Sequence, residues 1–362
     1  MAVRTVGVEE EFLLVDPVSG RPRAVGGAVL QAAEDDSELT AELHREQLET
    51  GTRPCVGLDE LGRELRGTRA VAAAAASAVG VDLVALATSP LAVEPTVSPS
   101  PRYRKMAQRF GLTVDEVMTC GCHVHVAIDS AEEGVAAADR IRPWLAPLLA
   151  LSVNSPFWQG ADSGYASFRS QLWTRWPSAG PYELFGSPAG YRGTVAAILG
   201  SDTVLDEGMI YFDARLSRHH PTLEIRVADV CLDPDDAVLI AALARALVET
   251  AVRGRRAGCA PDPVRTEVLR LASWRAGRSG LDGELLDPTT WRPAAAADVL
   301  NRLMAHVAPA LEDAGELETV RGLLDAVLRR GTGATRQRQV LERTGDLSAV
   351  VAAATAAGRG TG

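Results

Sequence analysis

Two glutamates that lie two residues apart open the most distinctive pattern in this sequence. If Gly7–Leu14 is read as a β-strand, Glu9 and Glu11 project from one face, because side chains alternate along a strand. The opposite face is apolar apart from Glu10. Two carboxylates this close repel each other unless a cation lies between them. The stretch is therefore either a solvated edge strand or one wall of a cation-binding site.

The same alternation of polar and apolar residues returns in four later stretches. These are Leu43–Thr52, Cys120–Ile128, Met209–Leu216 and Thr222–Ala228. If all five stretches join one sheet, their polar faces form a single concave wall. That wall would carry Glu9, Glu11, Gln47, Glu49, His123, His125, Tyr211, Asp213, Arg215, Glu224 and Arg226.

Such a wall is costly to bury unless ligands neutralise it. Carboxylate oxygens with one or two imidazoles suit Mg²⁺ or Mn²⁺, and arginines bind phosphate or carboxylate through two hydrogen bonds. Ordinary structural roles stay open for the separate parts: the histidines as satisfied polar residues, and Glu224 with Arg226 as an ion pair. Cys122 points away from His123 in a regular strand, which disfavours a shared zinc ion.

Helices must cover the apolar faces of these strands. Apolar spacing and caps predict a buried strand at Val81–Ala87, a turn at Gly331–Arg338 before a last helix, and a long, aromatic-rich functional loop at Asn154–Gly190. We predict an α+β fold with a curved, mainly antiparallel sheet of about six strands and helices on its convex side. No linker divides residues 1–362, so we expect one domain, sheet-rich over 1–232 and helical over 233–362. The expected helices are Leu58–Gly80, Asp139–Val153, Tyr191–Gly200, Asp235–Arg253, Pro263–Ala276, Ala294–Leu311 and Glu316–Leu328.

Composition excludes several classes of function. A net charge of -10 argues against a nucleic-acid partner. No apolar run is long enough to cross a bilayer, no signal peptide opens the chain, and five cysteines do not suggest a disulfide framework, so we expect a cytoplasmic protein. Lys105 is the only lysine, and its position excludes a P-loop and a pyridoxal Schiff base.

Several motifs, taken together and in this order, resemble the bacterial type 2 glutamate–cysteine ligases, also called YbdK-like carboxylate–amine ligases. The resemblance spans nearly the whole chain. It implies a fold related to the catalytic domain of glutamine synthetase, with ATP and metal on the concave face of the sheet. The motifs are Gly7–Phe12, Gln47–Thr50, Gly121–Val126, Asn154–Trp158, Leu223–Asp229, Trp274–Ala276 and Gly333–Arg338.

The resemblance also implies roles for individual residues. His125 matches a place where more distant glutamate–cysteine ligases prefer an amide, so it would bind substrate instead of metal. Glu49, Arg215 and Arg226 would be catalytic. The metal ligands would be Glu9, Glu11, Glu49, His123 and Glu224, and the nucleotide-binding residues Gln47, Arg169, Arg215, Arg226 and Arg336.

The expected reaction joins the γ-carboxylate of L-glutamate to L-cysteine with ATP and Mg²⁺ or Mn²⁺, through an acyl phosphate. The partners would be small molecules, and because family members tend to form dimers we expect a homodimer. Three alternatives remain: the same chemistry on another acid and amine, a metal-dependent hydrolase suggested by His123 and His125, and an inactive nucleotide-binding protein.

Overall fold

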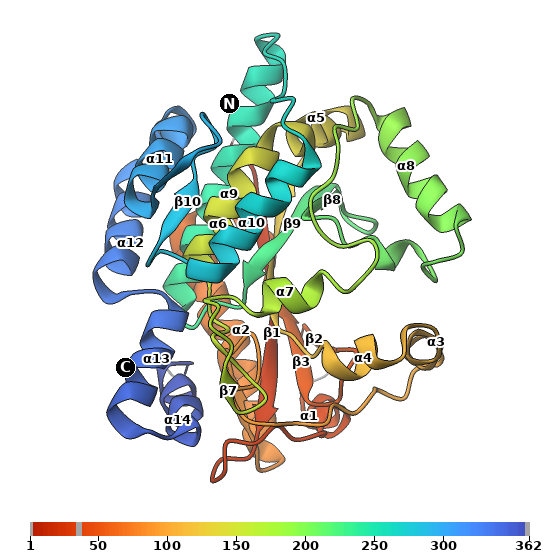
Figure 1. Ribbon diagram of the computed structural model, residues 1–362, viewed down its shortest axis with the longest axis vertical. Helices are drawn as coiled ribbons and strands as arrows, with labels where there is room; N and C mark the ends of the chain where they lie inside the picture. Colours follow the sequence, from red (N-terminus) through yellow and green to blue (C-terminus); the bar gives the residue numbers. More distant parts are fainter. Residues whose placement is uncertain (1–2, 34–37, 359–362) are drawn as a thin grey trace.

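A seven-stranded sheet forms the centre of the computed structural model, which describes residues 3–33 and 38–358 (Figure 1). The strand order is β2-β3-β1-β5-β9-β8, with β4 also pairing with β1, and every one of these pairings is antiparallel. The strands are β1 (Val6–Val15), β2 (Leu39–Ala41), β3 (Gln47–Gly51), β4 (Asp82–Val84), β5 (Gly121–Ala127), β8 (Ala214–Leu216) and β9 (Thr222–Asp229).

The register of the central strands aligns the polar side chains in rows. Glu9 lies opposite His123 on β5, and Glu11 lies opposite Glu49 on β3. On β9, Arg226 and Val227 together face the single residue His123, because the register shifts between Cys122 and Val124. This β-bulge adds one residue to β9, and bulges of this kind often redirect a side chain beside an active site.

The apolar face of the sheet packs on four helices and forms the main hydrophobic core. Val8, Val124 and Ile225 from three adjacent strands are all buried in it. The covering helices are α2 (Leu58–Ala78), α5 (Ala131–Ile141), α6 (Leu145–Ser152) and α9 (Pro234–Arg256). Glu10 points into this side, where Arg69 of α2 donates hydrogen bonds to its carboxylate.

The remaining helices surround this core, and residues 233–358 are largely helical. The C-terminal α13 and α14 lie together at one end of the molecule, opposite α8 in the view of Figure 1. The remaining helices of the described residues are α1 (Gly26–Ala32), α3 (Pro101–Phe110), α4 (Leu112–Glu116), α7 (Arg169–Trp173), α8 (Pro188–Gly200), α10 (Thr266–Ser279), α11 (Ala296–Asp313), α12 (Leu317–Arg330), α13 (Gly333–Thr344) and α14 (Leu347–Gly358).

Several predicted elements differ in extent from the observed ones. The helix expected at Asp139–Val153 is interrupted by a 3₁₀ turn at Arg142–Trp144, because Pro143 cannot donate a helical hydrogen bond. The strand expected at Met209–Leu216 is reduced to β8, preceded by the 3₁₀ helix η2 (Glu207–Met209). Two short hairpins were not expected, β6 (Phe157–Trp158) with β7 (Ala161–Asp162) and β10 (Glu284–Leu286) with β11 (Pro293–Ala295).

The turn predicted at Gly331–Arg338 is mostly helix. Thr332 caps α13 by accepting a hydrogen bond from the Thr335 amide, so most of that segment is the first half of the helix. None of the helices within the described residues combines the length and apolar character needed to cross a membrane.

Buried hydrogen bonds hold the long segment that starts at Asn154. The Asn154 amide and the Ser155 and Ser167 hydroxyls donate to the Asp229 carboxylate at 2.7–2.9 Å. The Gln337 side chain of α13 donates to Oδ1 of Asn154 at 2.7 Å. These contacts attach both the loop and the C-terminal helices to the end of β9.

Candidate active site

A cavity of about 290 Å³ opens on the polar face of the sheet. Its floor consists of side chains from β1, β3 and β5, and its walls come from α3, α7 and the segment before β8. A neighbouring cavity of about 150 Å³ shares Glu9, Gly208 and Arg215 with it. The two cavities therefore meet over the centre of the predicted wall.

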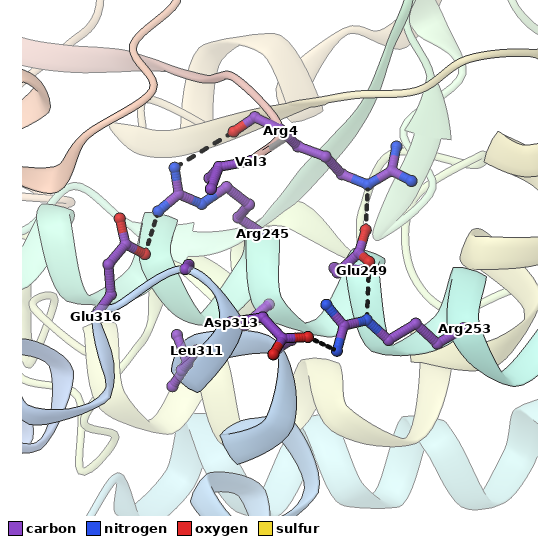
Figure 2. Close-up of a pocket in the computed structure, with 11 residues that line it drawn as sticks. Val3, Arg4, Arg245, Glu249, Arg253, Leu311, Asp313 and Glu316 are labelled. Atoms are coloured by element: carbon purple, nitrogen blue, oxygen red, sulfur yellow. Dashed lines mark hydrogen bonds and ion pairs between the residues drawn. The ribbon is translucent and has the colours of Figure 1, made fainter. Parts of the chain in front are cut away.

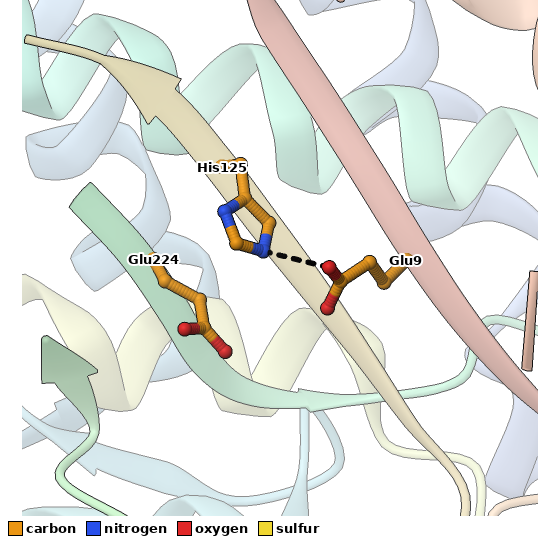
Figure 3. Close-up of side chains that lie close together, drawn as sticks. All are labelled: Glu9, His125 and Glu224. Carbon is orange, nitrogen blue, oxygen red and sulfur yellow. Dashed lines mark ion pairs between the residues drawn. The ribbon is translucent and has the colours of Figure 1, made fainter. Parts of the chain in front are cut away.

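Glu9 stands between two imidazoles. Its carboxylate lies 3.1 Å from Nε2 of His125 and 3.5 Å from Nδ1 of His123. Burial disfavours the charge on Glu9, but the favourable interactions with the two imidazoles outweigh burial and lower its pKa. Thr222 lies 2.9 Å from Nδ1 of His125 and orients that ring, so that Nε2 faces Glu9 and Glu224 (Figure 3).

A second acidic group lies at the β2–β3 side of the cavity. Oxygen atoms of Glu11, Glu42 and Glu49 all come within 4.8 Å of one another. Burial and the charge of Glu11 raise the pKa of Glu42 to about 7, and burial with the charges of Glu42, Glu9 and Glu11 raises the pKa of Glu49. Three carboxylates this close are stable together only when protons or cations neutralise them.

Glu224, unlike Glu42 and Glu49, has a lowered pKa, because two arginines surround its carboxylate. Arg215 donates to both of its oxygens, at 2.7 and 3.1 Å, and Arg226 donates to Oε1, which Nη2 of Arg215 also contacts. Burial alone would raise the pKa of Glu224, yet the two guanidiniums, Arg226 first, lower it to about 2. This carboxylate is therefore ionised at neutral pH and available to a cation on the side shared with Glu9 and His125.

An aromatic stack fixes Arg226. Its guanidinium lies 5.9 Å from the ring centre of Trp173 and 5.8 Å from that of Tyr211. Arg169 lies 5.5 Å from the Trp173 ring. Nε of Arg226 is buried without a hydrogen-bond partner among the described residues. Arg226 is thus held rigidly at the cavity with donor capacity in reserve.

The structure brings most of the predicted site residues together but not all. Gln47 lines the main cavity, with its amide nitrogen donating to the Thr119 carbonyl at 2.8 Å. Arg169 is buried behind Trp173, 3.7 Å from Asp229, and Arg336 lies on α13, 4.0 Å from Asp233. Neither of these two arginines lines either cavity.

Asp213 was expected on the polar wall and is not there. It lines a separate, very small cavity with Arg142 and Tyr182, because the segment before β8 is not a regular strand and does not alternate as predicted. Burial raises the pKa of Asp213 to about 7.

Sequence reasoning missed Glu42 and Arg102. Glu42 follows the three-residue β2, which is too short to show an alternating pattern. Arg102 lies in the first turn of α3 and lines the main cavity. The available signals were an acidic residue shortly before Gln47–Gly51 and a basic residue directly after Pro99 and Pro101, and neither is specific.

A further cavity, of about 40 Å³, lies between α9 and α11, far from the polar wall. Figure 2 shows that ion pairs join its charged groups: Arg4 with Glu249, Arg253 with Glu249 and Asp313, and Arg245 with Glu316. Its charges stabilise the packing of the helices and need no ligand.

The donor set on the polar face fits divalent cations. Three groups of carboxylates and imidazoles each bring their ligand atoms within 4.8 Å of one another. In addition, Nε2 of both His123 and His125 is buried and makes no hydrogen bond to any described residue, although Glu9 stands near. The groups are Glu9–His125–Glu224, Glu9–Glu49–His123 and Glu11–Glu42–Glu49.

A polar face of clustered carboxylates, imidazoles and guanidiniums fits the class of ATP-dependent ligases that form amide bonds. A family model described as glutamate-cysteine ligase family 2 (GCS2) matches residues 5–353. The chain belongs to this family, as its motifs predicted.

Relatives and solved structures agree with this assignment. A protein of Streptomyces avermitilis named "Putative glutamate--cysteine ligase 2-1" is 54% identical over 349 residues, which cover 95% of this chain and 96% of the relative. A protein of Streptomyces coelicolor named "Putative glutamate--cysteine ligase 2" is 54% identical over 355 residues, which cover 97% and 98%.

Two solved structures share the fold at low sequence identity. A bifunctional glutathione synthetase from Pasteurella multocida superposes with a TM-score of 0.71 at 17% identity; the match covers 98% of this chain and 52% of that one. A glutamate–cysteine ligase from Francisella tularensis in complex with AMP gives a TM-score of 0.65 at 13% identity, covering 99% and 89%. The predicted α+β, glutamine synthetase-like fold is confirmed.

Proposed function

We propose that this protein is an ATP- and Mg²⁺-dependent carboxylate–amine ligase that joins the γ-carboxylate of L-glutamate to the amine of L-cysteine. Mn²⁺ would also serve. The observation that carries this proposal is the meeting of three groups of candidate cation ligands on one face of the sheet, beside two arginines that pair with Glu224. Two of the groups combine carboxylates with an imidazole, and the third consists of three carboxylates. The names of the relatives support the choice of substrates.

The cation ligands follow from the three groups. We assign Glu9, Glu11, Glu49, His123 and Glu224 this role, as the family resemblance implied. The structure favours adding Glu42 and His125, because their ligand atoms lie within the same groups. Bound cations would neutralise charge on the phosphates of ATP during transfer.

The reaction needs an activated carboxylate, because a free carboxylate resists attack by an amine. Transfer of the γ-phosphoryl group of ATP to the acid forms an acyl phosphate and ADP. The amine then attacks the acyl carbon, phosphate leaves, and the amine gives up a proton. Arg226, held by Trp173 and Tyr211, is placed to stabilise charge that develops on the transferred group.

Glu49 and Arg215 complete the proposed catalytic set. Glu49 lines the main cavity, and in this proposal its carboxylate accepts the proton that the amine gives up. Arg215 holds Glu224 in place and lines both cavities. Contact of ATP with Gln47, Arg169 and Arg336 stays a prediction; Arg169 would act through Trp173.

The whole chain 1–362 is proposed as one ligase domain in the cytoplasm. The main core supports a single domain, because it joins Val6 and Leu223 of the sheet to Leu303 and Leu324 of the C-terminal helices. A homodimer stays a prediction.

Phosphate release from ATP across a panel of carboxylic acids and amines, with and without Mg²⁺, tests the proposal. We expect release that requires Mg²⁺, an acid and an amine together, fastest with glutamate and cysteine. Release that is independent of every acid would overturn the ligase assignment. Equal or faster release with another pair would keep the chemistry and change the substrates.

A further inference from the structure

Arg102, which lines the main cavity, pairs with Asp206 from a segment far away in the sequence. Nε of Arg102 donates to Oδ2 of Asp206 at 2.7 Å, and Nη2 donates to Oδ1 at 2.9 Å. The pair lies against Gly208, where a Cβ atom would stand 3.0 Å from Oδ1 of Asp206 and 3.2 Å from Nη2 of Arg102. Glycine at this position therefore leaves room for a planar, two-bond contact between guanidinium and carboxylate.

The other arginines that line this cavity, Arg215 and Arg226, both hold Glu224. Arg215 uses Nε and Nη2 on Glu224 and Nη1 on the Gly208 and Ile210 carbonyls. Arg226 donates to Glu224 from within its aromatic stack. Arg102 differs, because its partner Asp206 does not itself line the cavity, and about a third of each side chain is exposed. Ion pairs this exposed contribute little stability, so another carboxylate can exchange with Asp206 at low cost.

The charges around Arg102 favour a substrate that carries both signs. The floor opposite holds Glu9, Glu11, Glu42 and Glu49, which attract cations and ammonium groups. Arg102 stands on the α3 wall of the same cavity. An amino acid can satisfy both, whereas a simple amine leaves Arg102 without an anion from the substrate.

We infer that Arg102 is the receptor for the α-carboxylate of an amino-acid substrate, and that Asp206 occupies this receptor until the substrate displaces it. The inference rests on the proposed ligase function and adds to it a residue that recognises the α-carboxylate of the substrate. The α-carboxylate could belong to the acid substrate or to the amine substrate, and the experiment separates these sources.

The test compares each amino acid with an analogue that lacks only the α-carboxylate. Glutamate is compared with 4-aminobutyrate, and cysteine with 2-aminoethanethiol, by kcat/KM and by calorimetric binding without ATP. We expect wild type to prefer at least one amino acid over its analogue, and Arg102→Ala to reduce that preference at least about tenfold. If Arg102→Ala weakens the preference for glutamate over 4-aminobutyrate, Arg102 holds the acid substrate. If it weakens the preference for cysteine over 2-aminoethanethiol, Arg102 holds the amine substrate.

Two further variants distinguish recognition of the substrate from a purely structural role, in which the ion pair only holds α3 against the segment that carries Asp206. Asp206→Asn removes the competing charge and leaves Arg102 in place, so the preference should be kept or increased. If the ion pair only holds α3 against η2, Asp206→Asn and Arg102→Ala will instead behave alike. Arg109→Ala is the matched control, because Arg109 of α3 pairs with Asp202 of the same neighbouring segment but does not line the cavity.

The outcomes distinguish this inference from the proposed function. Absence of ligation with every acid and amine would refute the ligase proposal, while the calorimetric comparison would still report on Arg102. An unchanged preference in a folded Arg102→Ala protein would overturn the inference and leave the ligase proposal intact. The same is true if wild type binds each analogue as tightly as its amino acid.

Discussion

Nε2 of His125 on β5 lies 3.1 Å from the carboxylate of Glu9 on β1. This contact joins two adjacent strands of the sheet at the point where the two site cavities meet. Glu9 belongs to two of the three candidate cation groups. Among the other carboxylates of these groups, only Glu49 also belongs to two. Its removal should therefore disturb more of the site than the removal of Glu11 or Glu42.

Glu9→Gln should lower ATP turnover at least about a hundredfold, because an amide keeps the shape of the side chain and loses the charge that holds a cation. Turnover and the affinity for Mn²⁺, followed by electron paramagnetic resonance, check this. Glu132→Gln, on the exposed surface of α5, is the control. Normal Mn²⁺ affinity in folded Glu9→Gln would refute the assignment of Glu9 as a cation ligand.

The pair formed by Arg69 and Glu10 should be important for folding. Both side chains are almost fully buried, so Arg69→Met would leave an unpaired carboxylate in the core and cost about 3–5 kcal/mol of unfolding free energy. Urea denaturation measures this. Adding Glu10→Leu should restore much of the loss. Arg53→Met breaks the exposed pair with Glu64 and should cost under about 1 kcal/mol; equal losses at both sites would contradict this account.

Gly333 should tolerate no side chain. A Cβ atom there would stand 2.2 Å from Oδ1 of Asn154, so Gly333→Ala must displace α13 from the loop and destabilise the protein by about 1–3 kcal/mol. Gly322→Ala in α12 meets nothing within 4 Å and should be neutral or stabilising. Thermal unfolding of the two variants makes the comparison. Similar melting temperatures would show that Asn154 does not fix α13.

How much of this could be read from the sequence depended on the length of each element. The long β1, β5 and β9 alternate over seven residues or more, and they revealed Glu9, His123 and Glu224. Glu42 was not predicted as a site residue, because the preceding strand β2 has only three residues and shows no alternating pattern. Asp213 was misplaced because a 3₁₀ turn and irregular chain replace most of the expected strand. Local irregularity of this kind is fixed by tertiary packing and leaves no periodic signal.

Asp213 should make stability depend on pH. Burial raises its folded-state pKa to about 7, so between about pH 4 and pH 7 the folded protein keeps a proton that the unfolded chain has lost. As the pH rises from about 4 to about 7, wild type should therefore lose stability relative to Asp213→Asn. The variant should be more stable by up to about 4 kcal/mol at pH 8, since about three pKa units separate the folded and unfolded states, and nearly equal below pH 4.

Chemical denaturation at several pH values measures this difference, with Asp325→Asn on the exposed face of α12 as the control. A variant that is less stable than wild type at pH 8 would show that the Asp213 carboxylate is charged and paired in the folded protein.

The fate of an oxygen atom tests the central claim most directly. Glutamate labelled with ¹⁸O in its γ-carboxylate is incubated with cysteine, ATP and Mg²⁺, and the released phosphate is analysed by mass spectrometry. If the carboxylate is activated as an acyl phosphate on this face of the sheet, each phosphate carries one ¹⁸O atom, and Glu224→Gln forms almost none. Phosphate released without the label would contradict the account.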